Sequence, residues 1–286
     1  MDIKALEEKE MIKGMIKGMT AVLALMMAVS LCAGAPAETP KTELTVFAAA
    51  SLTESLTEIK AKYEEANPDV SLVFNFDSSG TLKTQIQEGA VCDVFISAGQ
   101  KQMNQLDITK DEEKNPERLD FVQDGSRIDL LENKVALVIP ADNPKGIDSF
   151  DSLAELLKND GDFLMAMGNS DVPVGQYTQK ILAYYGLNEE ELAKAGKITY
   201  GSNVKEVTTQ VVEGSVDCGV VYGTDAFSAG LEVEDTATLE MCGQVIYPAA
   251  VMKNSAAPEA AQAFLDYLRG DEAMKVFEGI GFSPVP

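Results

Sequence analysis

Histidine and tryptophan are absent from the 286-residue chain, and only 4 residues are cysteine. Without histidine, the chain lacks the side chain that most often acts as a general base near neutral pH. Basic residues are scarce as well, since 23 Lys and Arg stand against 46 Asp and Glu and give a formal net charge of −23. Binding to nucleic acid requires clustered Lys and Arg. The composition therefore argues against a nucleic-acid-binding protein.

The overall composition is that of a folded protein. Hydrophobic residues make up 45% and charged residues 24% of the chain, as in ordinary globular proteins. The length suits one large or two medium domains. Beyond the N-terminal region, no stretch is apolar enough to span a bilayer.

The N-terminal region has the pattern of an export signal. Lys13 and Lys17 precede an apolar run over 21–31 that is too short to span a bilayer, and small residues follow up to Ala37. We therefore exclude residues 1–37 from the fold. The protein is expected to be exported, either to the periplasm or to the outer face of the cytoplasmic membrane.

Two processing sites are compatible with this signal. Cys32 stands where a lipid anchor would be attached, although Leu31 before it is bulkier than the small residue usual there. Cleavage after Ala37 is the alternative, and the sequence leaves both open.

The other thiols are Cys92, Cys218 and Cys242, an odd number for an exported chain. Their neighbours are apolar, which favours buried free thiols. No Cys-x-x-Cys spacing occurs, so a thiolate metal site is not expected.

Strands and helices alternate along the first part of the chain. The apolar spacing predicts strand 44–48, a helix capped by Ser51, strand 70–76, helix 81–89 and strand 91–97. This βαβαβ order is typical of a mostly parallel sheet covered by helices.

A second alternating series follows a polar, turn-rich segment over 107–126. It comprises strand 134–140, helix 149–157, strand 163–167, helix 175–185, strand 197–200, helix 204–214 and strand 218–222. The chain then returns with strand 244–252 and helices 258–269 and 271–279. We predict an α/β protein with two mixed, mostly parallel sheets flanked by helices. A ligand cleft is expected between two lobes, because ligands of open α/β sheets bind where strands end and helices begin.

Five strand-to-helix junctions consist mainly of small, neutral, hydrogen-bonding residues. They are the segments 48–52, 77–81, 172–175, 201–205 and 221–225. The first N–H groups of a helix have no partner within the helix, and its dipole places partial positive charge there. In so acidic a chain, we therefore expect an anion to be bound by dipoles rather than by cations.

Residues in these junctions also have structural explanations, since Ser51 and Ser79 taken singly can each cap a helix. The junction around Val174 is different, because Pro173 and Gly175 leave backbone N–H groups unobstructed. Tyr222 ends an apolar strand and can present its hydroxyl. Such a set of donors favours a fully deprotonated dianion, because hydrogen phosphate must also donate a hydrogen bond.

Several of these segments resemble the molybdate-binding protein (ModA) family of molybdate ABC transporters. The resemblance lies in 46–53, 78–82, 89–98, 172–175 and 220–226, and it extends from Leu44 to Phe282. It implies a type II periplasmic-binding-protein fold, with lobe I formed by 42–130 plus 247–286 and lobe II by 131–246.

The resemblance also implies the ligand and the residues that hold it. The hydroxyl and amide groups of Ser51 and Ser79 would bind molybdate from lobe I, and the amides of Val174 and Val204 with the hydroxyl of Tyr222 from lobe II. Tungstate is expected to bind to the same residues. They would be ligands of the metal oxyanion rather than of a bare cation, and no cofactor is expected. The implied partner is a membrane permease, and we expect a monomer.

Two positions depart from the family pattern. Gly80 replaces a third serine that is often found there, and Val174 stands where a smaller alanine is common. Because Val174 would act through its backbone, we expect the affinity for the anion to be retained.

Other ligands remain alternatives. Sulfate and phosphate are also tetrahedral oxyanions, and the sequence does not show the size of the pocket. Iron binding would draw on tyrosines, but Tyr184-Tyr185 lies in an apolar helical stretch, which favours packing.

An enzyme is not expected. A nucleophilic Ser51 or Ser79 would have no histidine as its base, and no Gly-x-Ser-x-Gly motif occurs. A Ser-dependent hydrolase that uses Lys83 or Lys205 as its base remains formally open.

Overall fold

The computed structural model describes residues 41–159 and 161–285. The export signal predicted over 1–37, together with Cys32 and Ala37, lies outside the described residues. Residues from Lys41 onward belong to one compact unit. Within the described residues, no helix combines the length and the apolar character needed to cross a membrane.

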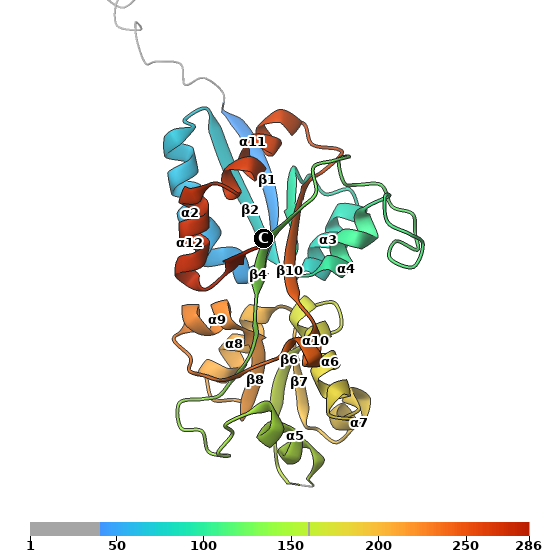
Figure 1. Cartoon of the computed structure of the whole chain (residues 1–286), viewed down its shortest axis with the longest axis vertical. Coiled ribbons are helices and arrows are strands. Elements are labelled where there is room, and N and C mark those ends of the chain that lie inside the picture. The colour runs from blue at the N-terminus through green and yellow to red at the C-terminus, as the bar shows by residue number, and fades with distance from the viewer. Residues whose placement is uncertain (1–40, 160, 286) are drawn as a thin grey trace, which may run out of the picture. The chain divides into compact units, whose positions relative to one another are not determined.

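The first sheet has six strands in the order β11-β4-β10-β3-β1-β2 (Figure 1). Their bounds are β1 Thr42–Ala49, β2 Val70–Asp77, β3 Val94–Ile96, β4 Ile128–Asn133, β10 Val245–Val251 and β11 Ser283–Pro284. Strand β1 pairs in parallel with β2 and β3, whereas β10 runs antiparallel to β3 and β4. Both ends of the described chain thus contribute to this sheet.

The second sheet has five strands in the order β7-β6-β8-β5-β9, all from the middle of the chain. Their bounds are β5 Val135–Val138, β6 Met165–Gly168, β7 Ile198–Gly201, β8 Cys218–Tyr222 and β9 Val233–Thr236. Strand β6 is parallel to β7 and β8, and β5 is antiparallel to β8 and β9. The prediction of two mixed sheets is confirmed.

Helices flank each sheet, and we call each sheet with its helices a lobe. The first lobe contains the 3-10 turn η1 Ala50–Leu52 and helices α2 Thr53–Ala66, α3 Ser79–Gln87, α4 Gln100–Leu106, α11 Pro258–Leu268 and α12 Asp271–Ile280. The second contains α5 Phe150–Lys158, α6 Pro173–Tyr184, α7 Glu189–Lys194, α8 Val204–Val212, α9 Gly223–Ala229 and α10 Leu239–Cys242. In Figure 1, α2 and α12 lie beside one side of the first sheet, and α3 and α4 beside the other.

Two connections join the sheets. Strand β4 ends at Asn133 in the first sheet and β5 begins at Val135 in the second, so the chain changes sheet at Lys134. It returns between Thr236 and Val245. The resemblance implies the limits 131–246 for lobe II. These limits stay a prediction, because the strands show only where the chain changes sheet.

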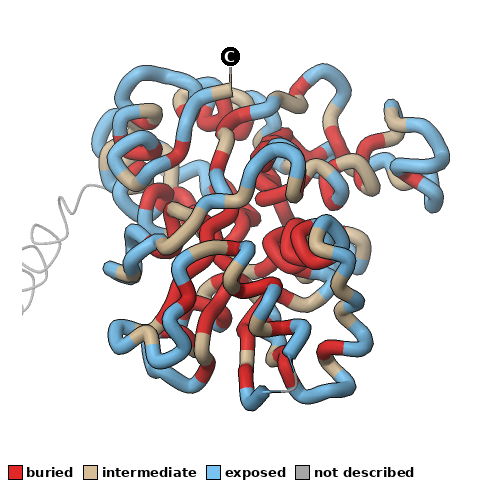
Figure 2. Tube along the Cα trace, turned by 60° about the horizontal axis from the view of Figure 1, so that its bottom comes forward, coloured by how far each residue is buried: buried red, intermediate tan, exposed pale blue. Residues whose placement is uncertain are grey.

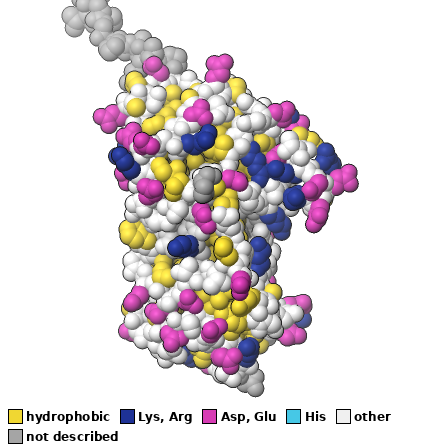
Figure 3. Space-filling model, in the orientation of Figure 1, with side chains coloured by type: hydrophobic (Ala, Val, Ile, Leu, Met, Phe, Trp, Pro, Cys, Tyr) yellow, Lys and Arg dark blue, Asp and Glu magenta, His cyan; other side chains and the backbone are white. Residues whose placement is uncertain are grey.

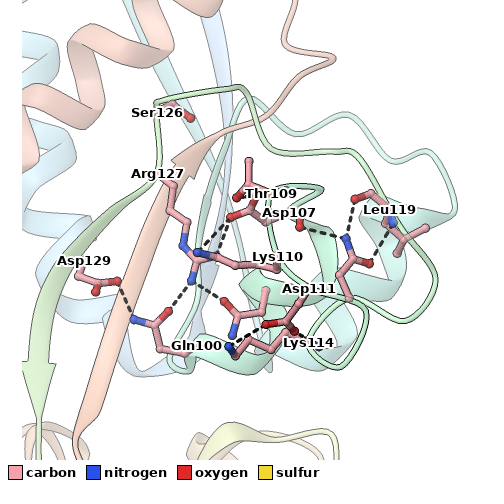
Figure 4. A network of polar contacts seen from close by, with 12 residues as sticks. Gln100, Asp107, Thr109, Lys110, Asp111, Lys114, Leu119, Ser126, Arg127 and Asp129 are labelled. Carbon is pink, nitrogen blue, oxygen red and sulfur yellow. Dashed lines mark hydrogen bonds and ion pairs between the residues drawn. The ribbon is translucent and has the colours of Figure 1, made fainter.

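The segment predicted to be polar and turn-rich contains no helix or strand over 107–126, apart from an isolated bridge between Val122 and Met252. Side-chain hydrogen bonds hold it instead, as Figure 4 shows. Arg127 Nη1 donates to Asp107 Oδ2 at 2.8 Å, and Asn115 Nδ2 donates to the Asp107 and Leu119 carbonyls at 3.0 and 2.8 Å. The segment is therefore tied to α4 and to the start of β4.

Apolar strands form the core. All seven residues of β10 and all five of β8 are buried, and Figure 2 shows buried segments through the middle of the molecule with exposed ones around them. Cys92, Cys218 and Cys242 are buried and free of disulfides, which confirms the expectation of buried thiols. Asp and Glu side chains are spread over the face seen in Figure 3, with Lys and Arg among them.

Candidate anion-binding site

A small cavity collects residues from all five predicted junctions. Four of the five predicted ligand residues line it, namely Ser51, Ser79, Val204 and Tyr222. The rest of its lining is Ala49, Ala50, Asp77, Ser78, Ala98, Val172 and Pro173. Strand ends and helix starts from both lobes therefore meet at one place.

Val174 is the predicted residue that does not line the cavity. Its side chain is fully buried in the core of the second lobe. Its neighbours Val172 and Pro173 line the cavity instead, at the N-cap and first position of α6. The larger side chain at Val174 therefore does not enter the cavity.

Ser51 does not cap a helix, so the cap predicted from the sequence is wrong. It lies inside η1, and the N-cap of α2 is Leu52, with no side-chain cap. The Ser51 Oγ instead lies 2.9 Å from the hydroxyl of Tyr247 on β10. Its side chain is thus placed by a partner far away in the sequence.

Ser78 caps a helix, whereas Ser79 does not. Ser78 is the N-cap of α3, and its Oγ accepts a hydrogen bond from Thr81 N at 3.1 Å. Ser79 Oγ accepts from Ala98 N at 2.9 Å. The capping explanation therefore applies to Ser78, and Ser79 is available at the cavity.

The second lobe places Val204 and Tyr222 in the same way. Val204 is the first residue of α8, whose N-cap Asn203 accepts from Glu206 N at 3.1 Å. Tyr222 is the N-cap residue of α9 and donates its hydroxyl proton to the Ala98 carbonyl at 3.3 Å. This hydrogen bond joins the two lobes beside the cavity.

The lobes approach each other closely around the cavity. A Cβ built on Gly80 of α3 would lie 2.3 Å from the Asp171 carbonyl oxygen, and one on Gly99 would lie 3.2 Å from Pro173 Cβ. The cavity volume is about 10 Å³, roughly the space of a single water molecule. The lobes are thus closed in this structure, and little space is left between them.

Charged side chains lie at the edge of this contact. Lys205 Nζ forms an ion pair with Asp225 Oδ1 at 3.1 Å. Burial raises the pKa of Asp225 to about 6, even though Lys205 acts in the opposite direction. Burial lowers the pKa of Lys205, but Asp225 and Glu54 outweigh this and the pKa is raised. Lys205 therefore stays a cation.

The tyrosine hydroxyls at the site stay protonated. Burial raises the pKa of both Tyr222 and Tyr247 well above the ordinary value. The site thus offers neutral hydroxyl donors. Asp77 is the one carboxylate in the lining, and its Oδ1 accepts from Ser78 N at 2.7 Å.

Comparison with known proteins agrees with this architecture. Residues 44–283 match the family model described as bacterial extracellular solute-binding protein. The chain belongs to this family. The match covers both lobes and all five junctions.

Relatives with assigned names support the family membership. A protein of Bacillus subtilis (strain 168) named "Putative ABC transporter substrate-binding lipoprotein YvgL" is 34% identical over 249 residues, with 85% of this chain and 87% of the relative covered. The molybdate-binding protein ModA of Haemophilus influenzae is 31% identical over 245 residues, with 84% and 90% covered.

A solved structure establishes the type of fold. The periplasmic molybdate-binding protein of Azotobacter vinelandii superposes with a TM-score of 0.70 at 22% identity, covering 85% of this chain and 99% of that one. At this identity the likeness concerns the fold alone. The predicted two-lobed type II periplasmic-binding-protein fold is thereby confirmed.

The comparisons bear on enzymatic activity as well. The named relatives above are solute-binding proteins, whereas one relative at 24% identity is named aconitate isomerase. Among the described residues, no three His, Cys, Asp or Glu side chains form a metal-binding group.

Proposed function

We propose that the protein captures molybdate between its lobes and delivers it to the membrane permease of an ABC transporter. The observation that carries this proposal is the convergence of all five junctions on one cavity lined by the hydroxyls of Ser51, Ser79 and Tyr222. The molybdate-binding relative at 31% identity supports the choice of anion.

The proposed ligand shell consists of neutral donors. A dianion buried without a cation must replace its water by many hydrogen bonds. The hydroxyls of Ser51, Ser79 and Tyr222 and the amide of Val204 would supply them, with Tyr222 exchanging its hydrogen bond to the Ala98 carbonyl for one to the anion. The amide of Val174, next to the lining residue Pro173, would also have to join them when the anion binds. Tungstate has the same charge and shape as molybdate and should bind at the same residues. One chain suffices, because both lobes of one molecule line the cavity.

Lobe closure would couple binding to transport. A ligand that contacts both lobes favours the closed state by its differential affinity, and the closed surface is what the permease would recognise. Small-angle scattering of the exported domain should show compaction when molybdate is added. Unchanged scattering on saturation would contradict the closure mechanism.

Calorimetric titration with molybdate, tungstate, sulfate and phosphate tests the choice of ligand. We expect molybdate and tungstate to bind and to displace each other. Tighter binding of sulfate or phosphate would overturn the choice. Asp77 makes the phosphate measurement informative, because a carboxylate in the lining can accept the proton of hydrogen phosphate.

A further inference from the structure

We propose that Asn133 and Tyr247 are positioning residues that fix the Ser51 hydroxyl as a hydrogen-bond donor to the bound anion. The inference rests on the proposed function, since it concerns the same cavity. Neither residue lines the cavity. They lie on β4 and β10, the strands of the first sheet that adjoin the connections to the second lobe.

The orientation of the Asn133 amide is set by its neighbours. Lys134 N donates to Asn133 Oδ1 at 2.8 Å, so this atom is the acceptor. The Nδ2 group then donates to Thr224 Oγ1 at 2.9 Å and to Tyr247 Oη at 3.1 Å. An amide nitrogen can only donate. Tyr247 Oη is therefore the acceptor of the second bond.

The direction of the next hydrogen bond follows. Tyr247 is fully buried, and its hydroxyl makes close hydrogen bonds to Asn133 and Ser51, with the Tyr222 hydroxyl as a further polar neighbour. Because Asn133 donates to it, the Tyr247 proton is directed to Ser51 Oγ, the close acceptor at 2.9 Å. In the reverse direction this proton would lose its close acceptor, which costs free energy.

Ser51 Oγ therefore accepts from Tyr247 and keeps its own proton for another partner. The side chain lines the cavity, so this proton is available to an anion there. The Ser79 hydroxyl is oriented in the same way by a different partner, because its Oγ accepts a hydrogen bond from the backbone N–H of Ala98 at 2.9 Å. Both serine hydroxyls accept from the protein and can donate to the ligand.

Aromatic packing holds the Tyr247 ring in place. Its centroid lies 5.7 Å from that of Tyr222 and 5.3 Å from that of Phe282, both in edge-to-face geometry. Since Thr224 belongs to α9 of the second lobe, Asn133 also ties this chain of hydrogen bonds to both lobes. The hydroxyl orientation is thus a property of the assembled site.

The consequence is selectivity by protonation state. A fully deprotonated oxyanion can accept from both serines, whereas a protonated one must place its own O–H group elsewhere. In Tyr247→Phe, Ser51 Oγ loses the donor that fixes its orientation, so the hydroxyl can rotate and accept that proton. The variant should therefore lose discrimination as well as some affinity.

The test measures molybdate and phosphate affinity by calorimetry, at a pH where phosphate is mainly hydrogen phosphate. Compared with the wild type, Tyr247→Phe should lower the preference for molybdate by about tenfold, the value of one hydrogen bond of this kind. In a Ser51→Ala background, the same substitution should leave the preference unchanged. Tyr177→Phe is the matched control, because Tyr177 is buried beside Tyr222 and its hydroxyl has no partner among the described residues.

Each outcome decides the proposal. If Tyr247→Phe weakens both anions by the same factor, Tyr247 only packs, and the positioning role is wrong while the proposed function stands. If the wild type binds neither anion, the proposed function falls and the positioning role falls with it. Should Tyr247→Phe fail to fold, Asn133→Leu serves as the second variant, because it withdraws the donor that orients Tyr247. An unchanged preference in a folded Asn133→Leu would overturn the inference.

Discussion

Lys205 Nζ on α8 lies 2.8 Å from each carboxylate oxygen of Glu54 on α2, so an ion pair joins the two lobes. The same ammonium group also lies 3.1 Å from Asp225 Oδ1. Closure of the lobes therefore brings Glu54 to a cation that the second lobe already holds in place.

Glu54→Gln should weaken molybdate binding, because it removes the inter-lobe partner and leaves the Lys205–Asp225 pair intact. We expect a loss of about 0.2–1 kcal/mol in binding free energy, the usual range for a partly exposed pair. High salt should shrink the loss. Calorimetry of Glu58→Gln is the control, since Glu58 pairs at 3.6 Å with Lys62 of its own helix. Equal effects of the two variants would contradict a role in closure.

Gly80→Ala should hinder closure, because the new Cβ would lie 2.3 Å from the Asp171 carbonyl oxygen of the opposite lobe. Backbone on both sides leaves no flexible side chain to yield. Molybdate affinity should fall by roughly 1–3 kcal/mol, the usual cost of forcing extra atoms into a packed contact. Gly279→Ala on α12 is the control, because nothing lies within 4 Å of its added Cβ. Wild-type affinity in Gly80→Ala would show that the lobes do not need this contact.

Asp225 should give stability a distinct dependence on pH. Its pKa is raised from 3.8 to about 6 by burial, so between these values the folded protein holds a proton that the unfolded chain has released. Its contribution to stability is therefore largest below about pH 4 and is lost as the pH rises to about 6, by on the order of 3 kcal/mol. Urea unfolding from pH 4 to 7 should show this loss relative to Asp225→Asn. Parallel pH profiles of the two proteins would contradict it.

Ser51→Ala and Ser79→Ala should each weaken molybdate binding by roughly 1.5–3 kcal/mol, because a hydrogen bond to a charged group is removed. Ser55→Ala is the matched control. Ser55 is equally buried, but its Oγ donates to the Leu52 carbonyl at 3.1 Å and does not line the cavity. Calorimetry that finds full affinity in both site variants would remove the two serines from the ligand shell.

Much of the fold was predictable because its central strands are apolar throughout. Strand β8 covers Cys218–Tyr222, the same residues as the prediction, and all of them are buried. Strands β4 and β9 were missed, because acidic residues such as Asp129 and Glu234 interrupt them and their pairing with β10 and β5 is a tertiary effect. Helix α9 was missed because it begins directly after β8.

The candidate site was predictable where local sequence sets the backbone. All five junctions contribute to the cavity, because strand ends and helix starts are encoded locally. The sequence did not show that Ser78 caps α3 and that Ser79 does not. Ser79 instead accepts from Ala98 N, a contact that depends on the tertiary structure. The contact of Ser51 with Tyr247 joins residues 196 positions apart, for which the sequence carries no signal.

The central claim is that an oxyanion is bound between Ser51 and Ser79 of one lobe and Tyr222 of the other. Crystals grown with molybdate, with diffraction recorded at the molybdenum absorption edge, locate the metal directly. The account predicts one strong anomalous peak inside the cavity, within hydrogen-bonding reach of both serine hydroxyls through the anion's oxygens. A peak elsewhere on the protein, or none at saturating molybdate, would contradict it.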